Sequence, residues 1–260
     1  MRIKYFFLST LFFSWSFWVI AILLGQNYMA FPTVLFYAIG GFGPSVMGLI
    51  FIFRTYNKEE LEEFRSRSFN PKRIGLVWYV IIILLPLLQI IISMIIGSFV
   101  WNDLTFRGAI STFSFGVFIP SYFVLLVVAV FAEEFGWRAY ALDAYLQHDI
   151  SPIKASLYVG MCWSIWHFPL YLINGTFQNS FGFGSIEFFL YSIDIIPGTF
   201  IYTWIYKNNN RSVLSVLLFH FFGNFISEMF EISMRVQIIR LISSFLIAAL
   251  IILYFRKENS

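Results

Sequence analysis

Eight apolar segments run through this sequence, and each is close to the length that a helix needs to cross a membrane. At 1.5 Å per residue, about 20 apolar residues span the hydrocarbon core of a bilayer. The pattern predicts an all-α, polytopic membrane protein with about eight transmembrane helices in a single transmembrane domain over residues 1–260. The segments are 5–25, 31–53, 74–100, 113–135, 152–174, 185–206, 211–231 and 236–255.

Composition supports an integral membrane protein. The chain is 59% hydrophobic and 12% charged, whereas soluble domains carry about 25% charged residues. A net charge of +3 does not suggest a nucleic-acid partner, so the bilayer is the expected surrounding. Cys162 is the sole cysteine and cannot form an internal disulfide. The apolar run after Lys4 lacks a clear cleavage site, so we expect it to be retained as the first helix.

The basic residues predict how the helices are oriented. With both termini in the cytoplasm, only Arg107, Arg235 and Arg240 of the 17 Lys and Arg residues would face outward. This asymmetry favours an even number of spans. The polar stretch 54–73 would then lie in the cytoplasm, where we expect a solvated amphipathic connector.

Two adjacent acids, Glu133 and Glu134, follow an uncharged run. A charge near the bilayer centre costs about 2.5–3.5 kcal/mol on insertion scales, so intramembrane acids are rare and usually functional. Residues i and i+4 share a helix face. The spacing therefore predicts an ion pair between Glu134 and Arg138, and it leaves Glu133 free to face a cavity. Alternatively, both acids lie at the water boundary and solvate the end of a helix.

Two further segments carry polar residues at helical spacing. His167 follows Trp163 by four residues, so an indole and an imidazole share one face. His220 and Asn224 have the same spacing, and Gly223 between them would let a neighbouring backbone approach closely. Each pair alone is also explained by packing hydrogen bonds between helices.

Residue counting places these groups at one depth. At 1.5 Å per residue, His167 lies about 24 Å from the start of its segment, and His220 lies about 20 Å from Lys207. Glu133 reaches the same level, about 21 Å above its helix end, if that helix continues to Gln147. The residues before that point contain no helix breaker, so we predict the continuation and a shared polar cavity enclosed by the helices.

A carboxylate, two imidazoles and an amide in one cavity are the parts of a hydrolytic site, on catalytic helices within about 113–231. Glu133 can act as general base on a water, and a histidine can share that role. Asn224 and the second histidine can donate to an oxyanion. Glu133, His167 and His220 also match a catalytic zinc set. The sequence lacks His-Glu-x-x-His and Gly-x-Ser-x-Gly, so activation by Glu and His and activation by zinc both stay open.

The three motifs together resemble the CAAX protease and bacteriocin-processing family, called CPBP or Abi, which includes the type II CAAX prenyl endopeptidase. They are Glu-Glu-x-x-x-Arg at Glu133, aromatic-x-x-x-His at Trp163 and His-x-x-x-Asn at His220. The match covers roughly residues 131–224. The family's second motif usually begins with Phe, and Trp163 in that place could reshape the substrate groove. The context is similar to the bacterial branch, which implies a bacterial cell membrane.

The resemblance implies an intramembrane endopeptidase, with a membrane-associated protein or hydrophobic peptide as substrate. It assigns the activation of water to Glu133, helped by His167. His220 and Asn224 would stabilise the oxyanion or complete the site. Three residues have supporting roles: Glu134, Arg138 and Trp163.

Two other functions would use the same residues differently. A non-proteolytic bacteriocin-immunity or scaffold protein would use them as packing hydrogen bonds. A proton-coupled transporter would use Glu133 with Asp194, an acid in the middle of an apolar segment, but no repeated half is visible. Asp194 could instead brace a site histidine. We expect Arg240 to pair with Glu228 or Glu231.

Overall fold

The computed structural model describes residues 2–101, 118–230 and 233–258, and its elements there are all helices. The predicted all-α class is confirmed. Five described helices are long and apolar enough to cross a membrane: α1 (Ile3–Leu24), α5 (Leu76–Trp101), the continuous helix Pro120–Gln147, α11 (Ile186–Asn208) and α13 (Met234–Glu258). The helices α2 (Thr33–Gly41) and α3 (Gly43–Thr55) make a sixth span if this pair, bent by 45°, is counted as one.

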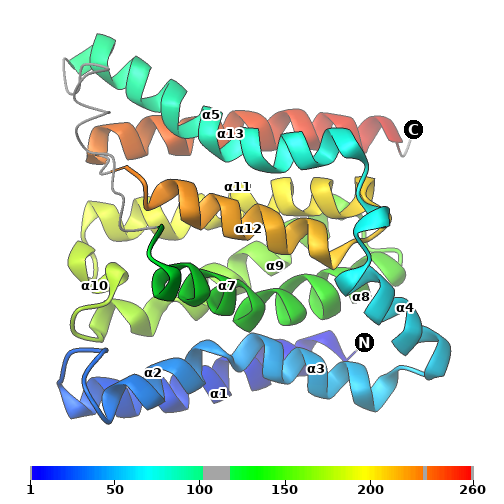
Figure 1. Ribbon diagram of the computed structural model, residues 1–260, viewed down its shortest axis with the longest axis horizontal. Coiled ribbons are helices and arrows are strands. Elements are labelled where there is room, and N and C mark those ends of the chain that lie inside the picture. Colours follow the sequence, from blue (N-terminus) through cyan, green and yellow to red (C-terminus); the bar gives the residue numbers. More distant parts are fainter. Residues whose placement is uncertain (1, 102–117, 231–232, 259–260) are drawn as a thin grey trace.

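The predicted count of eight spans is not confirmed. Helices α9 (Pro152–Trp166) and α12 (Val213–Ser227) have 15 residues each, fewer than the roughly 17–25 that a spanning helix needs. Both run alongside the longer helices (Figure 1). The start of the predicted segment 113–135 lies outside the described residues, which resume at residue 118.

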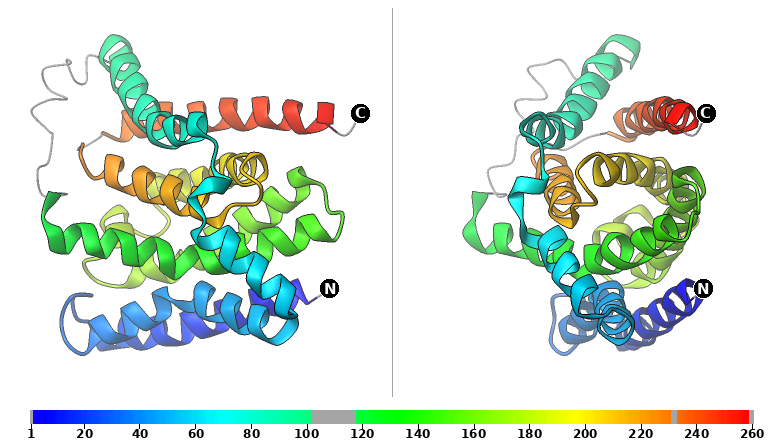
Figure 2. Two further views of the ribbon diagram at one scale, coloured as in Figure 1. Left: turned by 45° about the vertical axis from the view of Figure 1, so that its right-hand side comes forward. Right: turned by 90° about the vertical axis from the view of Figure 1, so that its right-hand side faces the viewer.

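The helices lie side by side, with both termini and the short helix α4 (Lys58–Phe69) at one end of the bundle and α10 (Phe177–Phe181) at the other (Figure 1). Helix α3 packs against α7 (Pro120–Glu134), α12 packs between α7 and α5, and α11 packs against both α9 and α13 (Figure 2). Helices α7, α9, α11 and α12 therefore border one interior. The orientation of this bundle in a membrane stays a prediction.

The helix that begins at Pro120 continues to Gln147, as the sequence predicted. Its middle is not α-helical, however. After α7, the segment η3 (Phe135–Leu142) is a π-helix, and α8 (Asp143–Gln147) returns to α geometry. A π turn is wider than an α turn and occurs frequently at functional sites. Here it begins directly after Glu134.

A close contact between α3 and the π-helix explains why glycine occupies positions 48 and 136. A Cβ atom added to Gly48 would lie 2.7 Å from the Cα atom of Gly136, and one added to Gly136 would overlap the backbone carbonyl of Pro44. Only residues without a side chain allow the two backbones to come this near. Helix α3 is thereby fixed against the segment that carries Arg138.

Helix α4 is docked on the bundle, so the predicted solvated connector is wrong for its inner face. The side chain of Arg67 is 1% exposed, and its NH1 atom lies 2.9 Å from Oδ1 of the fully buried Asp143. Arg211 donates to the same carboxylate from Nε at 2.8 Å, and Tyr206 donates from its hydroxyl at 2.7 Å. A buried carboxylate needs such partners. Burial, with the Asp143 charge second, raises the pKa of Tyr56 to about 12.

Candidate active site

Glu134 joins two helices through one oxygen atom. Its side chain is 0% exposed, and Oε1 accepts a hydrogen bond from NH1 of Arg138 at 2.7 Å. Nδ1 of His220, on α12, lies 2.7 Å from the same oxygen. The predicted ion pair with Arg138 is confirmed. The contact with His220 was not predicted, and it holds one ring nitrogen of that histidine while leaving Nε2 without a hydrogen-bond partner among the described residues.

Glu133 has a different partner and is partly exposed. Nε1 of Trp163, on α9, donates to its Oε2 atom at 2.6 Å. The two acids therefore point to different neighbours, as the helical phase predicted. The ring centroid of Trp163 lies 5.6 Å from that of His220 and 5.9 Å from that of His167. Trp163 thus brings together three of the side chains that the sequence selected.

His167 lies at the end of its helix, not inside it. Helix α9 ends at Trp166, three residues before Pro169, which cannot donate a helical hydrogen bond. The amide of His167 bonds to the carbonyl of Ser164, so the carbonyl of Trp163 lacks its usual backbone donor. Nδ1 of His167 takes that place at 2.8 Å. Because a carbonyl only accepts, Nδ1 carries the proton, and Nε2 of the neutral ring is an acceptor.

Arg138 is held between two aromatic rings. Its Cζ atom lies 4.1 Å from the ring centroid of Trp163 and 3.9 Å from that of Tyr202, on α11. Stacking of this kind stabilises a desolvated guanidinium. The ring of Tyr202 also meets that of His220 at 5.8 Å. Sequence reasoning missed Tyr202 because no motif distinguishes it among 14 tyrosines.

Asn224 lies one turn beyond His220 on α12 and is partly exposed. Its side chain makes no hydrogen bond with the described residues, so its amide is available to a ligand. The prediction for the neighbouring Gly223 is wrong. A Cβ atom added there would meet nothing within 4 Å, so no backbone packs against this glycine among the described residues.

The proposed zinc ligands do not form a metal site in this arrangement. The described residues contain no group of three His, Cys, Asp or Glu side chains placed to hold a metal ion. The donor set of Glu133, His167 and His220 therefore does not fit zinc in this arrangement.

Asp194 has a partner on another helix. Its Oδ2 atom accepts a hydrogen bond from NH2 of Arg240, on α13, at 3.0 Å. Arg240 therefore pairs with Asp194 and not with Glu228, and Glu231, its other predicted partner, lies outside the described residues. The ion pair links α11 to α13, and the structure gives Asp194 no contact with a site histidine.

These contacts define a class of protein. It is a polytopic helical membrane protein in which one acid and two imidazoles from three helices surround one indole, beside a buried ion pair between Glu134 and Arg138. The sequence model of Type II CAAX prenyl endopeptidase Rce1-like proteins matches residues 114–226, the part of the chain that carries all of these residues.

A curated relative extends this match along most of the chain. The chain is 36% identical over 226 residues to CAAX prenyl protease 2 of Methanococcus maripaludis. The aligned region covers 84% of this chain and 80% of the relative. The chain therefore belongs to the Rce1-like family of type II CAAX prenyl endopeptidases. The resemblance drawn from the three motifs is confirmed at this level, and membership supports an intramembrane endopeptidase activity.

Proposed function

We propose that this chain hydrolyses a peptide bond of a membrane-associated protein with a water molecule that Glu133 and His167 activate. The observation that carries the proposal is the placing of Glu133. Trp163 holds its Oε2 atom at 2.6 Å, while Oε1 has no hydrogen-bond partner among the described residues. A carboxylate that is oriented by one oxygen and free at the other has the geometry of a general base.

The reaction follows from the hydrogen-bonding capacity of each group. Glu133 accepts a proton from water as the water oxygen attacks the carbonyl carbon, and Nε2 of His167 accepts the hydrogen bond of the second water proton. The carbonyl oxygen becomes an oxyanion, to which the Asn224 amide and Nε2–H of His220 donate. Glu133 then passes its proton to the amide nitrogen as the oxyanion re-forms a carbonyl and the C–N bond breaks. This releases an amine and a carboxylic acid, which loses the second water proton to solvent.

Glu134 and Arg138 have supporting roles in this proposal. The Glu134 carboxylate accepts from Nδ1 of His220, so it stabilises the ring when both nitrogens carry protons. Arg138 balances the charge of Glu134 in a position that water does not reach, since both side chains are fully buried. Neither residue would touch the substrate.

The substrate proposal comes from the Methanococcus maripaludis relative, which is a CAAX prenyl protease. For this chain we propose the same class of substrate, which is a membrane-associated protein or peptide that reaches the site from the membrane. A prenylated peptide that ends in a CAAX sequence is therefore the first substrate to test, and a non-prenylated peptide of the same sequence is its control.

The test compares three proteins purified in detergent: the wild type, Glu133→Gln and Glu59→Gln. Glu59 is an exposed acid on α4, so its substitution controls for the loss of one carboxylate. General-base catalysis contributes about 10²–10⁴-fold, so we expect at least a 100-fold loss of kcat in Glu133→Gln and none in Glu59→Gln. Wild-type cleavage by Glu133→Gln would reject this mechanism, whereas no cleavage by the wild type itself would favour a non-proteolytic role.

A further inference from the structure

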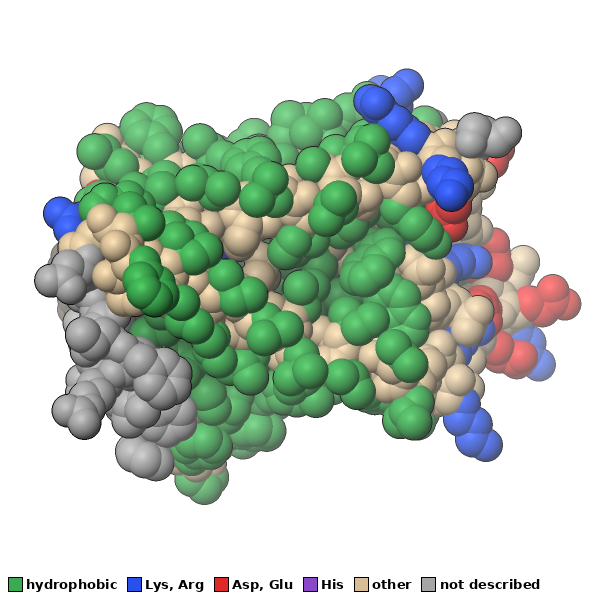
Figure 3. Space-filling model, turned by 90° about the horizontal axis from the view of Figure 1, so that it is seen from above, with side chains coloured by type: hydrophobic (Ala, Val, Ile, Leu, Met, Phe, Trp, Pro, Cys, Tyr) green, Lys and Arg blue, Asp and Glu red, His purple; other side chains and the backbone are tan. Residues whose placement is uncertain are grey.

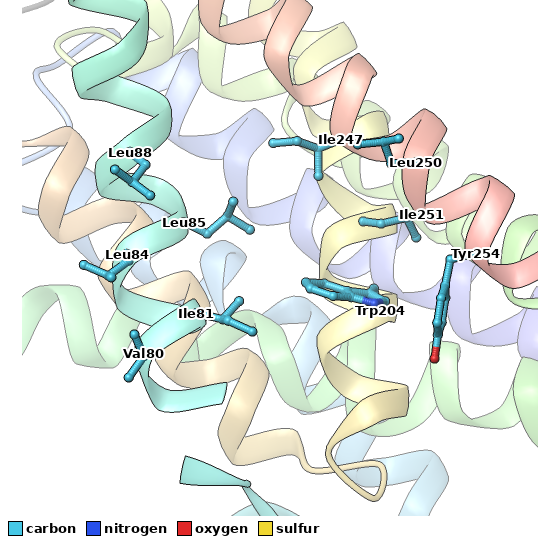
Figure 4. Close-up of a pocket in the computed structure, with 10 residues that line it drawn as sticks. All are labelled: Val80, Ile81, Leu84, Leu85, Leu88, Trp204, Ile247, Leu250, Ile251 and Tyr254. Carbon is cyan, nitrogen blue, oxygen red and sulfur yellow. The ribbon is translucent and has the colours of Figure 1, made fainter. Parts of the chain in front are cut away.

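A groove with a volume of about 520 Å³ opens between α5 and α13. One wall is α5 from Val80 to Leu88, the other is α13 from Ile247 to Tyr254, and Trp204 of α11 lies between them (Figure 4). The groove is open on a face that is covered with hydrophobic side chains (Figure 3). Its volume lies within the range of about 300–1,000 Å³ that is typical of small-molecule sites.

The groove and the candidate active site lie on opposite sides of α11. Tyr202 packs its ring against Arg138 and His220, whereas Trp204 faces the groove. These two residues are two positions apart, so their side chains point about 200° apart on a helix of 3.6 residues per turn. A peptide bound at Glu133 would have α11 between it and the groove. The peptide part of a substrate bound at Glu133 therefore does not occupy the groove.

The length of the groove matches one leaflet of a bilayer. The wall from Val80 to Leu88 is about 12 Å long at 1.5 Å per residue, and one half of the hydrocarbon core is about 15 Å thick. The groove closes where Nε2 of Gln89 meets the hydroxyls of Ser243 and Ser244, each at 3.4 Å. A transmembrane helix would need the full core thickness, so the groove is too short for it.

Polar side chains mark the open end of the groove. The hydroxyl of Tyr254 bonds to Oδ1 of Asn208 and to Oε1 of Glu258, each at 3.1 Å. Nζ of Lys207 lies 2.8 Å from Oε2 of Glu258. Tyrosine and lysine are typical of the level at which lipid headgroups lie. The groove therefore runs from the headgroup level into the apolar core.

An apolar cavity of this kind does not hold water, because its lining offers a water molecule no polar partners. A hydrocarbon chain from the surrounding bilayer matches both the apolar lining and the length of the groove. We propose that the groove binds one acyl chain of a membrane phospholipid, whose headgroup lies beside Lys207 and Tyr254. The bound lipid fills the space between α5 and α13 at the end where these helices diverge.

The test uses a phosphatidylcholine that carries a photoactivatable diazirine on its acyl chain, with the whole chain reconstituted in phosphatidylcholine vesicles. Leu84→Trp and Leu250→Trp place an indole in the groove. Ile83→Trp and Leu253→Trp are matched controls outside it, with exposures of 38% and 60% against 41% and 67% for the groove positions. Thermal unfolding of all four variants confirms that each is folded.

In the wild type and both controls, we expect the labelled residues to concentrate on the two groove walls. In the two filled variants, labelling of those walls should fall at least about tenfold, since an occupied cavity leaves no room for a chain. Equal labelling in filled and control variants would overturn the proposal, as would labels spread evenly over all lipid-facing helices. Displacement of the probe by a prenylated peptide would also overturn it, because the groove would then belong to the substrate.

Discussion

Nδ1 of His220 lies 2.7 Å from Oε1 of Glu134, the same atom to which Arg138 donates at 2.7 Å. One buried oxygen therefore fixes the ring of a histidine on α12 and the guanidinium of its own helix. Because Glu133 occupies the neighbouring position, the two acids have distinct tasks. Glu134 positions other side chains, and Glu133 is the partly exposed acid.

The first prediction concerns Glu134→Gln, which keeps the shape of the side chain but removes its charge. Arg138 is then a buried cation without its counterion, and removing one partner of a buried pair costs about 3–5 kcal/mol. We expect the midpoint of thermal unfolding to fall clearly. The orientation of His220 also depends on this charge, so kcat should fall by about 10–100-fold in the folded fraction, which corresponds to the 1.5–3 kcal/mol of a hydrogen bond to a charged group.

A double-mutant cycle separates these effects. If Glu134→Gln and Arg138→Gln are coupled as the geometry requires, the double variant is less destabilised than the sum of the single variants. Additive changes in the free energy of unfolding would mean that the ion pair is not formed in the folded protein.

The second prediction concerns Trp163→Phe. Phenylalanine keeps an aromatic ring against Arg138, which lies 4.1 Å from the indole, but it cannot donate to Glu133. Loss of a hydrogen bond to a carboxylate costs about 1.5–3 kcal/mol. We expect kcat to fall by at least about tenfold, with a small change in thermal stability. Trp163→Leu removes the ring as well and should lower both quantities. A kcat unchanged in Trp163→Phe would show that the indole does not position Glu133 for reaction.

The sequence predicted those parts of the site that depend on a single helix. Glu134 and Arg138 are four residues apart, so helical geometry alone places them together, and the continuation to Gln147 followed from the absence of a breaker. Partners on different helices were out of reach, because tertiary packing and not spacing decides them. The bond between Trp163 and Glu133 joins residues that are 30 positions apart, and no local pattern marks it.

Three further features of the structure differ in how far the sequence marks them: the end of α9, the π-helix and the burial of Arg67. Pro169 indicates that α9 cannot continue through His167, so the helix end was visible in the sequence. The π-helix that begins at Phe135 had no such mark. The polar residues of α4 predicted an exposed helix, and Arg67 was therefore expected to be solvated. Its partner Asp143 lies 76 positions further along the chain, so no local pattern marks the ion pair.

The third prediction concerns metal dependence. Because the described donors do not form a group of three, we expect cleavage activity to persist after exhaustive treatment with EDTA and 1,10-phenanthroline. Metal content measured on the treated protein is the control that the treatment worked. Loss of activity that added zinc restores would contradict the mechanism and return Glu133, His167 and His220 to the role of ligands.

The fourth prediction concerns the buried cluster around Asp143. Asp143→Asn leaves Arg67, which is 1% exposed, without its counterion, so we expect a loss of about 3–5 kcal/mol in stability. Asp149→Asn is the matched control, since Asp149 is exposed and has a φ of 57°, which asparagine accepts readily. Thermal unfolding of both variants checks this. Equal stability of the two variants would mean that α4 is not fastened to the bundle through Asp143.

The fifth prediction concerns two glycines in helical segments, at which substitution by alanine should change the stability in opposite directions. An added methyl group at Gly136 would overlap the carbonyl of Pro44, which is backbone and cannot rotate away. Gly136→Ala should therefore destabilise the protein by about 1–3 kcal/mol through overpacking. At Gly223 the added methyl meets nothing within 4 Å, so Gly223→Ala should stabilise α12 by up to about 1 kcal/mol through helix propensity. Unfolding free energies of the two variants test both signs together. If Gly136→Ala were as stable as Gly223→Ala, the close approach of α3 to the π-helix would be refuted, and with it the contact that fixes α3 beside Arg138.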